Sequence, residues 1–297
     1  MAYVNGSAGS LESLRQSLFD ACTANGWSLA GSVLFKGSIY MQVLVQGAYL
    51  TIQGGTGVDG SNALVNPAPN YSRIGLLAGQ ALTWPMAYEV FIGSAPDEVY
   101  LVVNYNVDCY QYLAFGGSSM SGLPGTGAWF SASVAQTVQY IGIYPYGGAR
   151  PGFPNGSAPA MFHVTNTDGG GIVQNSFIHH GFDSKTWTDA NYTNGANAIN
   201  AAVPHVLRLP NAWNSEGVLV PIQVHIFRPE SKVTLVADLK NARYTRVDNY
   251  DPGQIIPLGP DRWKIFPWYR KNAAVRDGGD GINHTGTMGW AVRYDGP

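Results

Sequence analysis

Three runs in the first half of the chain decide its fold: YEVFIG at 88–93, EVYLVVNY at 98–105 and YQYLAFG at 110–116. Each run is rich in β-branched and aromatic residues, and a turn-forming stretch, SAPD at 94–97, separates the first two. Runs of this composition, bounded by such turns, are typical of antiparallel strands that follow one another in a sheet. The three runs therefore predict a β-meander.

The apolar residues that precede this meander recur at helical spacing. They are Leu11, Leu14, Leu18, Phe19 and Cys22. Ser10 is a good N-cap for such a helix, and Asn25-Gly26 is a typical C-terminal stop. The spacing predicts a helix over 11–24, with Trp27 folding back onto its apolar face.

Further runs predict strands on both sides of the meander. The segments 39–45 and 48–53, joined by Gln46-Gly47, have the pattern of a β-hairpin. Near the other end, 217–227 and 232–239 predict two strands joined by a turn.

The middle of the chain indicates a change of organisation. Residues 116–127 hold five glycines and a proline and no charge, which favours a boundary between a domain at 1–120 and a second at 121–297. Between 128 and 215, glycine-rich turns separate weak strand signals and predict long loops. We therefore expect a mainly β protein in which a short N-terminal helix packs on an antiparallel sheet, followed by a β-sandwich-like, loop-rich module whose C-terminal segment is aromatic and basic.

The charge of the chain is low and unevenly distributed. Charged residues make up 12% of the 297 positions, against roughly 25% in ordinary soluble domains. The net charge of −2 argues against a nucleic acid or an anionic membrane as partner. Positions 1–227 carry 17 charged residues and positions 228–297 carry 19. Such a charge-poor body predicts burial in a larger assembly, because an isolated surface with few charges is poorly soluble.

The two cysteines and the opening residues indicate where the chain is made. Cys22 and Cys109 lie far apart in the sequence, in segments that predict a helix and a strand, which does not indicate a disulfide framework. The opening residues are polar rather than basic and then apolar, and no run reaches the length of a membrane span. We therefore expect synthesis and assembly in a cytoplasm, without membrane insertion.

Two groups contain residue types that bind metals. They are His179-His180 with nearby Asp183, and Asp277, Asp280 and Asn283. Zinc or iron would suit the first group and calcium the second. Adjacent residues of a strand point to opposite faces, and the second group has no EF-hand spacing, so the sequence favours a structural role for the first and a solvated turn for the second. We predict no cofactor.

Catalytic motifs are weak. The chain has no Gly-x-Ser-x-Gly elbow, and the glycine-rich stretch 54–57 lacks the lysine of a phosphate-binding loop. A pair of catalytic carboxylates could be drawn from several acids, whose separations the sequence does not determine. These are Asp97, Glu98, Asp183, Asp189 and Glu216. We therefore predict a protein that is not an enzyme.

The C-terminal segment places cations directly among aromatic residues, as in WKIFPWYRKN at 263–272. Such interleaving favours cation–π contacts and concentrates the residue types that dominate protein interfaces. The segment therefore predicts either an interlocking surface between subunits or a tightly fastened terminal module. The candidate interface residues are Arg243, Tyr244, Arg246, Trp263, Phe266, Trp268, Tyr269, Arg270, Lys271 and Trp290.

This segment also carries a resemblance. The runs WKIFPWYRKN at 263–272, RDGG at 276–279 and HTGTMGWAVRY at 284–294 resemble virion structural proteins of tailed bacteriophages, as do ANGW at 24–27 and QYLAFG at 111–116. The resemblance implies a baseplate or tail-tip subunit located in the virion tail and assembled in the bacterial host. Implied partners are other copies of the chain, arranged as trimers or hexamers, other tail proteins, and tail fibres or a host-surface glycan. It implies no catalytic residues.

Two alternatives use residues of the middle region. Trp187, Tyr192 and Trp213 lie among Asn, Thr and Asp, where aromatic rings could stack on sugars, so a glycan-binding virion module is the first alternative. The second is a glycan depolymerase that uses acids such as Asp183 and Asp189.

Overall fold

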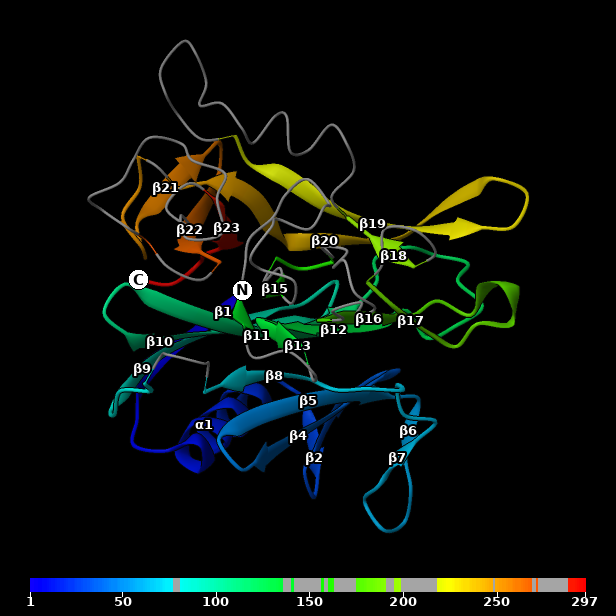
Figure 1. The fold of residues 1–297 in the computed structure, drawn as a ribbon, viewed down its shortest axis with the longest axis horizontal. Helices are drawn as coiled ribbons and strands as arrows, with labels where there is room; N and C mark the ends of the chain where they lie inside the picture. The colour runs from blue at the N-terminus through cyan, green and yellow to red at the C-terminus, as the bar shows by residue number, and fades with distance from the viewer. Residues whose placement is uncertain are drawn as a thin grey trace.

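The chain folds into three stacked β-layers, with the central layer covered on both faces (Figure 1). The computed structural model describes residues 1–76, 81–135, 140–141, 156–157, 160–162, 175–190, 195–198, 218–247, 249–268, 271 and 288–297. One hydrophobic core lies on each side of the central layer. The expected mainly β architecture with a helix near the N-terminus is confirmed.

The central sheet is antiparallel and has seven strands. In spatial order they are β1 (Ala2–Ala8), β9 (Met86–Gly93), β10 (Glu98–Asn106), β11 (Cys109–Gly117), β12 (Ala128–Ala132), β16 (Ser176–His179) and β17 (Trp187–Asp189). The predicted meander forms β9, β10 and β11, which pair in sequence order.

Strand β10 shows why this sheet takes the middle position. Val99, Leu101 and Val103 contribute to the core on one face, whereas Tyr100 and Val102 contribute to the core on the other. Alternate residues of a strand point to opposite faces, so a nearly continuous apolar run is stable only where both faces are covered.

The N-terminal sheet covers one face. Its strands, in spatial order, are β13 (Val134–Ala135), β8 (Ser72–Gly75), β5 (Tyr49–Gly55), β4 (Ile39–Gln46), β3 (Val33–Lys36) and β2 (Ser28–Ala30). The predicted 39–53 hairpin is therefore confirmed as β4 and β5, in a different layer from the meander.

Helix α1 (Leu11–Ala24) packs in the same core as the N-terminal sheet and has the predicted bounds. The backbone N–H of Ser13 donates to the Ser10 hydroxyl at 3.2 Å, which caps the first turn. Trp27 is buried in this core, and its ring meets that of Phe115 in β11 edge-on, with centroids 5.2 Å apart.

The C-terminal sheet covers the opposite face of the central sheet. Its strands, in spatial order, are β18 (Ala196–Asn197), β19 (Val220–Arg228), β20 (Lys232–Arg246), β23 (Met288–Arg293), β22 (Asp261–Pro267) and β21 (Ile255–Leu258). The predicted strand pair is confirmed as β19 and β20, and β20 continues beyond the predicted end at residue 239.

Smaller elements complete the described chain. They are the hairpin of β6 (Gly57–Val58) and β7 (Leu64–Val65), the parallel pair β14 (Tyr140–Ile141) and β15 (Gly156–Ser157), and the 3₁₀ turn η1 (Phe182–Ser184). No helix within the described ranges has both the length and the apolar character needed to span a membrane.

The predicted boundary at 116–127 falls inside the central sheet. Strands β11 and β12 lie on either side of this stretch and pair with each other, with Phe115 opposite Phe130. The glycine- and proline-rich stretch at 116–127 is therefore a loop between neighbouring strands of one sheet. The three layers divide the chain differently from the predicted ranges 1–120 and 121–297.

Candidate functional site

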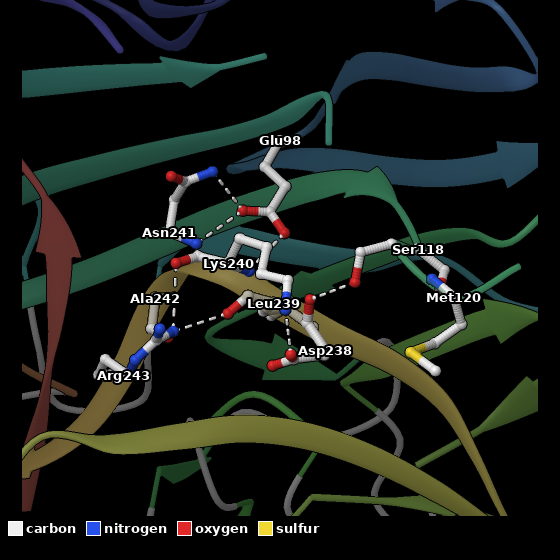
Figure 2. A network of polar contacts seen from close by, with 10 residues as sticks. Glu98, Ser118, Met120, Asp238, Leu239, Lys240, Asn241, Ala242 and Arg243 are labelled. Atoms are coloured by element: carbon white, nitrogen blue, oxygen red, sulfur yellow. Dashed lines mark hydrogen bonds and ion pairs between the residues drawn. The ribbon is translucent and has the colours of Figure 1, made fainter. Parts of the chain in front are cut away.

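A buried carboxylate, Glu98, joins the central sheet to the C-terminal sheet (Figure 2). It begins β10 and has no exposed surface. Its Oε2 accepts hydrogen bonds from the backbone N–H of Asn241 at 2.9 Å and from the Asn241 side chain at 2.7 Å. The backbone N–H of Lys240 donates to Oε1 at 3.0 Å, and the Tyr100 hydroxyl donates to Oε2 at 3.0 Å. We call Glu98, Tyr100, Lys240 and Asn241 the interlayer lock.

An irregularity in β20 supplies the two backbone donors. Leu239 pairs with Ile222 of β19, but the next paired residue, Arg243, lies opposite the adjacent Pro221. Residues 240–242 therefore bulge out of the ladder with β19. A bulge re-aims backbone and side-chain groups, and here it directs consecutive N–H groups at Glu98.

Arg243 supports the same bulge from its other side (Figure 2). Its Nη1 donates to the carbonyl oxygens of Leu239 at 2.9 Å and Ala242 at 2.7 Å. The guanidinium group lies over the Trp263 ring, 4.9 Å from the centroid. Carbonyls at the bulge thus gain a charged donor, which stabilises the irregular backbone.

Gly93 leaves room for the Asn241 side chain beside Glu98. A Cβ atom on Gly93 would lie 2.6 Å from Nδ2 of Asn241, the atom that donates to Glu98. The absent side chain therefore leaves the space in which the Asn241 amide reaches the carboxylate.

Burial and hydrogen bonding act on Glu98 in opposite directions. Burial raises the pKa of Glu98 from 4.5 to about 7, because desolvation disfavours the charged form. The donors of the lock oppose this rise, because they stabilise the carboxylate. The group therefore changes charge near neutral pH inside the protein and near pH 4.5 in the unfolded chain.

This shift predicts a pH dependence of stability. The folded state holds the Glu98 proton more tightly than the unfolded state, so the contribution to the free energy of unfolding is full below pH 4.5 and is lost as the pH rises through about 7. We expect a loss of about 3 kcal/mol across that window. Urea unfolding of the wild type and of Glu98→Gln at a series of pH values measures it.

The contribution of Glu98 is the difference between the pH dependence of stability of the wild type and that of Glu98→Gln. The comparison is needed because a second buried group, His180, has the opposite effect on stability. Burial lowers the pKa of His180 to about 4, so His180 makes stability rise with pH over part of the same window. Equal pH slopes in the wild type and Glu98→Gln would contradict the assignment.

Most of the predicted interface residues are buried in the chain's own core. The buried members are Tyr244, Arg246, Trp263, Phe266, Trp268, Lys271 and Trp290. The prediction of an exposed interface is therefore wrong for these residues, whereas the alternative of a tightly fastened terminal module fits their positions. Arg243 is partly buried and holds the β20 bulge, and Tyr269 and Arg270 lie outside the described residues.

Four aromatic members of this set, Tyr244, Phe266, Trp268 and Trp290, share a core with the central sheet, whereas Trp263 packs in a separate cluster with Ile265 and Ala291. The rings of Trp268 and Trp290 stack with centroids 5.1 Å apart and an interplanar angle of 6°. Tyr112 of β11 contacts both of these rings, and Tyr100 of β10 contacts Trp290 at 5.9 Å. We call Tyr100, Tyr112, Trp268 and Trp290 the aromatic interlayer cluster, which fastens the C-terminal sheet beside the lock.

The buried cation Lys271 contacts the backbone at two places. The Lys271 side chain donates to the carbonyl oxygen of Val247, and the Lys271 backbone N–H donates to the carbonyl oxygen of Asp108 at 3.0 Å. Asp108 lies in the β10–β11 turn. Lys271 therefore connects the C-terminal segment to the end of a central hairpin.

The candidate glycan residue Trp187 is not an exposed platform. It is 8% exposed, and its ring meets that of Phe130 at 5.6 Å. Its indole N–H donates to the carbonyl oxygen of Asn66 at 3.1 Å. The prediction that Trp187 stacks on a sugar is therefore wrong, because the ring packs in the core and its N–H already has a protein partner. Tyr192 and Trp213 lie outside the described residues.

The candidate metal residues near the end of β16 have protein partners. His179 Nδ1 accepts a hydrogen bond from the Thr126 backbone N–H at 2.9 Å, and His180 Nε2 lies 2.7 Å from the Thr188 hydroxyl. Asp183 forms a bidentate ion pair with Arg228, at 2.8 and 2.7 Å. Within the described residues, no group of three or more His, Cys, Asp or Glu side chains gathers for a metal ion. Asp277, Asp280 and Asn283 lie outside them.

The interlayer lock was not predicted from the sequence. Glu98 appeared there only as one acid among several, and nothing in the spacing connects it to Lys240 and Asn241, more than 140 positions away. The available signal was its place at the start of the apolar run EVYLVVNY, where a charged residue is unusual.

Comparison with known proteins adds no relative: no family model matches the chain, and no curated protein matches it. The site is therefore described by its geometry. It consists of the polar interlayer lock and the aromatic interlayer cluster, which together hold two sheets of one chain in contact.

Proposed function

We propose that the chain is a non-enzymatic structural subunit of a bacteriophage tail end, a baseplate or tail-tip component that contacts other copies of itself and neighbouring tail proteins. The observation that carries this proposal is the use of the C-terminal segment. The aromatic and basic residues that resemble phage virion proteins serve to close the third layer of a rigid β-framework. A framework of β-layers packed on one another suits a part that transmits load within an assembly.

The polar groups of the described residues support a scaffolding role. Glu98, Asn241, His180 and Asp183 each make hydrogen bonds or ion pairs that join separate strands or turns. The low charge over positions 1–227 fits a surface that neighbouring subunits cover. Host-surface glycan and tail fibres remain proposed partners of the assembly.

The proposal is tested by removing the chain from phage production. We expect lysates made without it to contain particles whose tail ends are incomplete and which do not infect, since a missing structural subunit stops assembly at its own step. Electron microscopy and infectivity measure this, with wild-type chain supplied in trans as control. Complete, infective particles that lack the chain would contradict the proposal.

A truncation that removes 263–297 is not a suitable variant for this test. It would delete most of β22, all of β23 and the cluster residues Trp268 and Trp290, and so uncover Tyr100 and Tyr112 of the central sheet. Such a chain would fail to fold, so a loss of assembly would carry no information about its function.

A further inference from the structure

The edges of the three large sheets differ sharply in how they are protected. Among the described strands, five of the six edge strands are short or interrupted: β17 with 3 residues, β13 with 2, β2 with 3, β18 with 2, and β21 with 4 residues that include Pro257. Short strands and prolines are the usual means by which proteins prevent pairing at a sheet edge. These five edges are therefore poor templates for another strand.

Strand β1 has none of these protections. It is 7 residues long, with the sequence AYVNGSA, and contains neither a charge nor a proline. It pairs with β9 on one side without a register shift, and Asn5, Gly6 and Ser7 are exposed. In an antiparallel pair, every second residue directs its N–H and C=O groups away from the partner. The outer edge of β1 is thus a regular template for a further strand.

Both ends of β1 are held in place. The Met1 amino group forms an ion pair with Asp295 at 2.7 Å, and the Tyr3 hydroxyl donates to Glu89 at 2.8 Å. At the other end, Ala8 is buried and leads into the N-cap of α1 at Ser10. A strand fixed in this way loses little conformational entropy when it pairs, which favours association.

We propose that the β1 edge binds the β1 edge of a second copy of this chain, so that two central sheets join into one continuous antiparallel sheet. This inference goes beyond the proposed function and does not depend on it. An edge that pairs with its own copy around a two-fold axis must be complementary to itself. With the axis at Asn5, Ala2 lies opposite Ala8, Tyr3 opposite Ser7 and Val4 opposite Gly6.

The composition of β1 favours its own copy as the partner. Identical strands that carry a charge near the axis place like charges opposite one another, which is destabilising. Because β1 carries no charged side chain, self-pairing costs no such repulsion. The small side chains at positions 2 and 6–8 also leave room for a second strand to approach.

A cysteine crosslink tests this contact directly. Directly opposed residues of an antiparallel pair have Cα atoms about 4.5–5.5 Å apart, within the range that a disulfide spans. We expect Asn5→Cys to form a covalent dimer under mild oxidation. Ser61→Cys, in the exposed turn of the β6–β7 hairpin, is the matched control and should remain monomeric. Both native cysteines are buried, so we expect them to contribute little background crosslinking.

A charge swap tests whether the contact is a pairing of identical strands. The wild type should sediment as a dimer or a larger even-numbered assembly, and Asn5→Lys and Asn5→Asp should each raise the dissociation constant at least about tenfold. An equimolar mixture of the two variants should recover association, since opposite charges then meet across the axis. Because Asn5 is exposed, we expect both variants to fold. Thermal unfolding of each variant checks this.

Three results would overturn the proposal. The first is a monomeric wild type at the highest soluble concentration, with no crosslink of Asn5→Cys above that of Ser61→Cys. The second is an assembly whose dissociation constant does not change in Asn5→Lys. The third is an Asn5→Cys crosslink in assembled particles to a different protein only, which would assign the edge to another partner.

Discussion

Trp290→Ala is expected to lower the free energy of unfolding by about 4 kcal/mol, since truncation of a buried tryptophan removes its burial energy and leaves a cavity. Trp290 is 1% exposed and stacks on Trp268 while contacting Tyr100 and Tyr112 of the central sheet. The substitution therefore removes the centre of the aromatic interlayer cluster. Urea unfolding followed by circular dichroism measures the loss.

The matched control is Phe227→Ala, an aromatic truncation in the same C-terminal sheet. Phe227 is 45% exposed, so its loss should cost less than about 1 kcal/mol. Equal losses in the two variants would mean that the aromatic cluster does not hold the layers together. A smaller loss in Trp290→Phe than in Trp290→Ala would assign the effect to packing volume.

Glu98→Ala is expected to lower the free energy of unfolding by about 3 kcal/mol or more at pH 6. The substitution removes the acceptor of the buried Asn241 backbone N–H and side-chain amide, and of the partly buried Lys240 backbone N–H. Each buried donor that loses its partner costs about 1–3 kcal/mol. At this pH the folded-state pKa of about 7 keeps Glu98 mainly protonated. The gain from removing a desolvated carboxyl group offsets part of that cost, which is why the estimate is lower than the sum over the lost hydrogen bonds.

Glu230→Ala is the control for Glu98→Ala. Glu230 pairs with Lys232 at the exposed tip of the β19–β20 hairpin, and such surface ion pairs contribute about 0–1 kcal/mol. We expect almost no change in stability. If Glu98→Ala were as stable as Glu230→Ala, the interlayer lock would have no role in joining the sheets.

The local structure of the chain could be predicted because its signals are local. The helix at 11–24, the 39–53 hairpin and the meander at 88–116 all follow from residue spacing and turn chemistry. The three-layer arrangement was harder to see. Its signal was the unbroken apolar run in EVYLVVNY, which indicates a strand buried on both faces.

The role of the C-terminal segment could not be settled by composition. Tryptophan, tyrosine and arginine are enriched at protein interfaces, yet the same large rings also fill cores. Only the pairing of β23 with β20 and of β22 with β23, over the central sheet, places Trp268 and Trp290 inside. The same limit applies to Trp187, whose polar neighbours in sequence suggested a loop platform.

The interlayer lock and the β1 edge could not be predicted because both depend on how distant parts of the chain are arranged. Glu98 acquires its environment from a bulge far along the chain, and an edge strand is recognised only once the order of strands is known. Both are properties of topology. The sequence indicates only that the opening residues are polar, although they form the seven-residue strand β1.

The central claim, a place in the tail end of a phage particle, is tested most directly by labelling the chain in assembled virions. Pro297 is exposed, so a short peptide tag can follow it without disturbing the layers. Electron microscopy with a gold-conjugated antibody against the tag then locates the subunit. The account predicts label at the tail end. Label on the capsid, or particles without label although the tagged chain is expressed and folded, would contradict it.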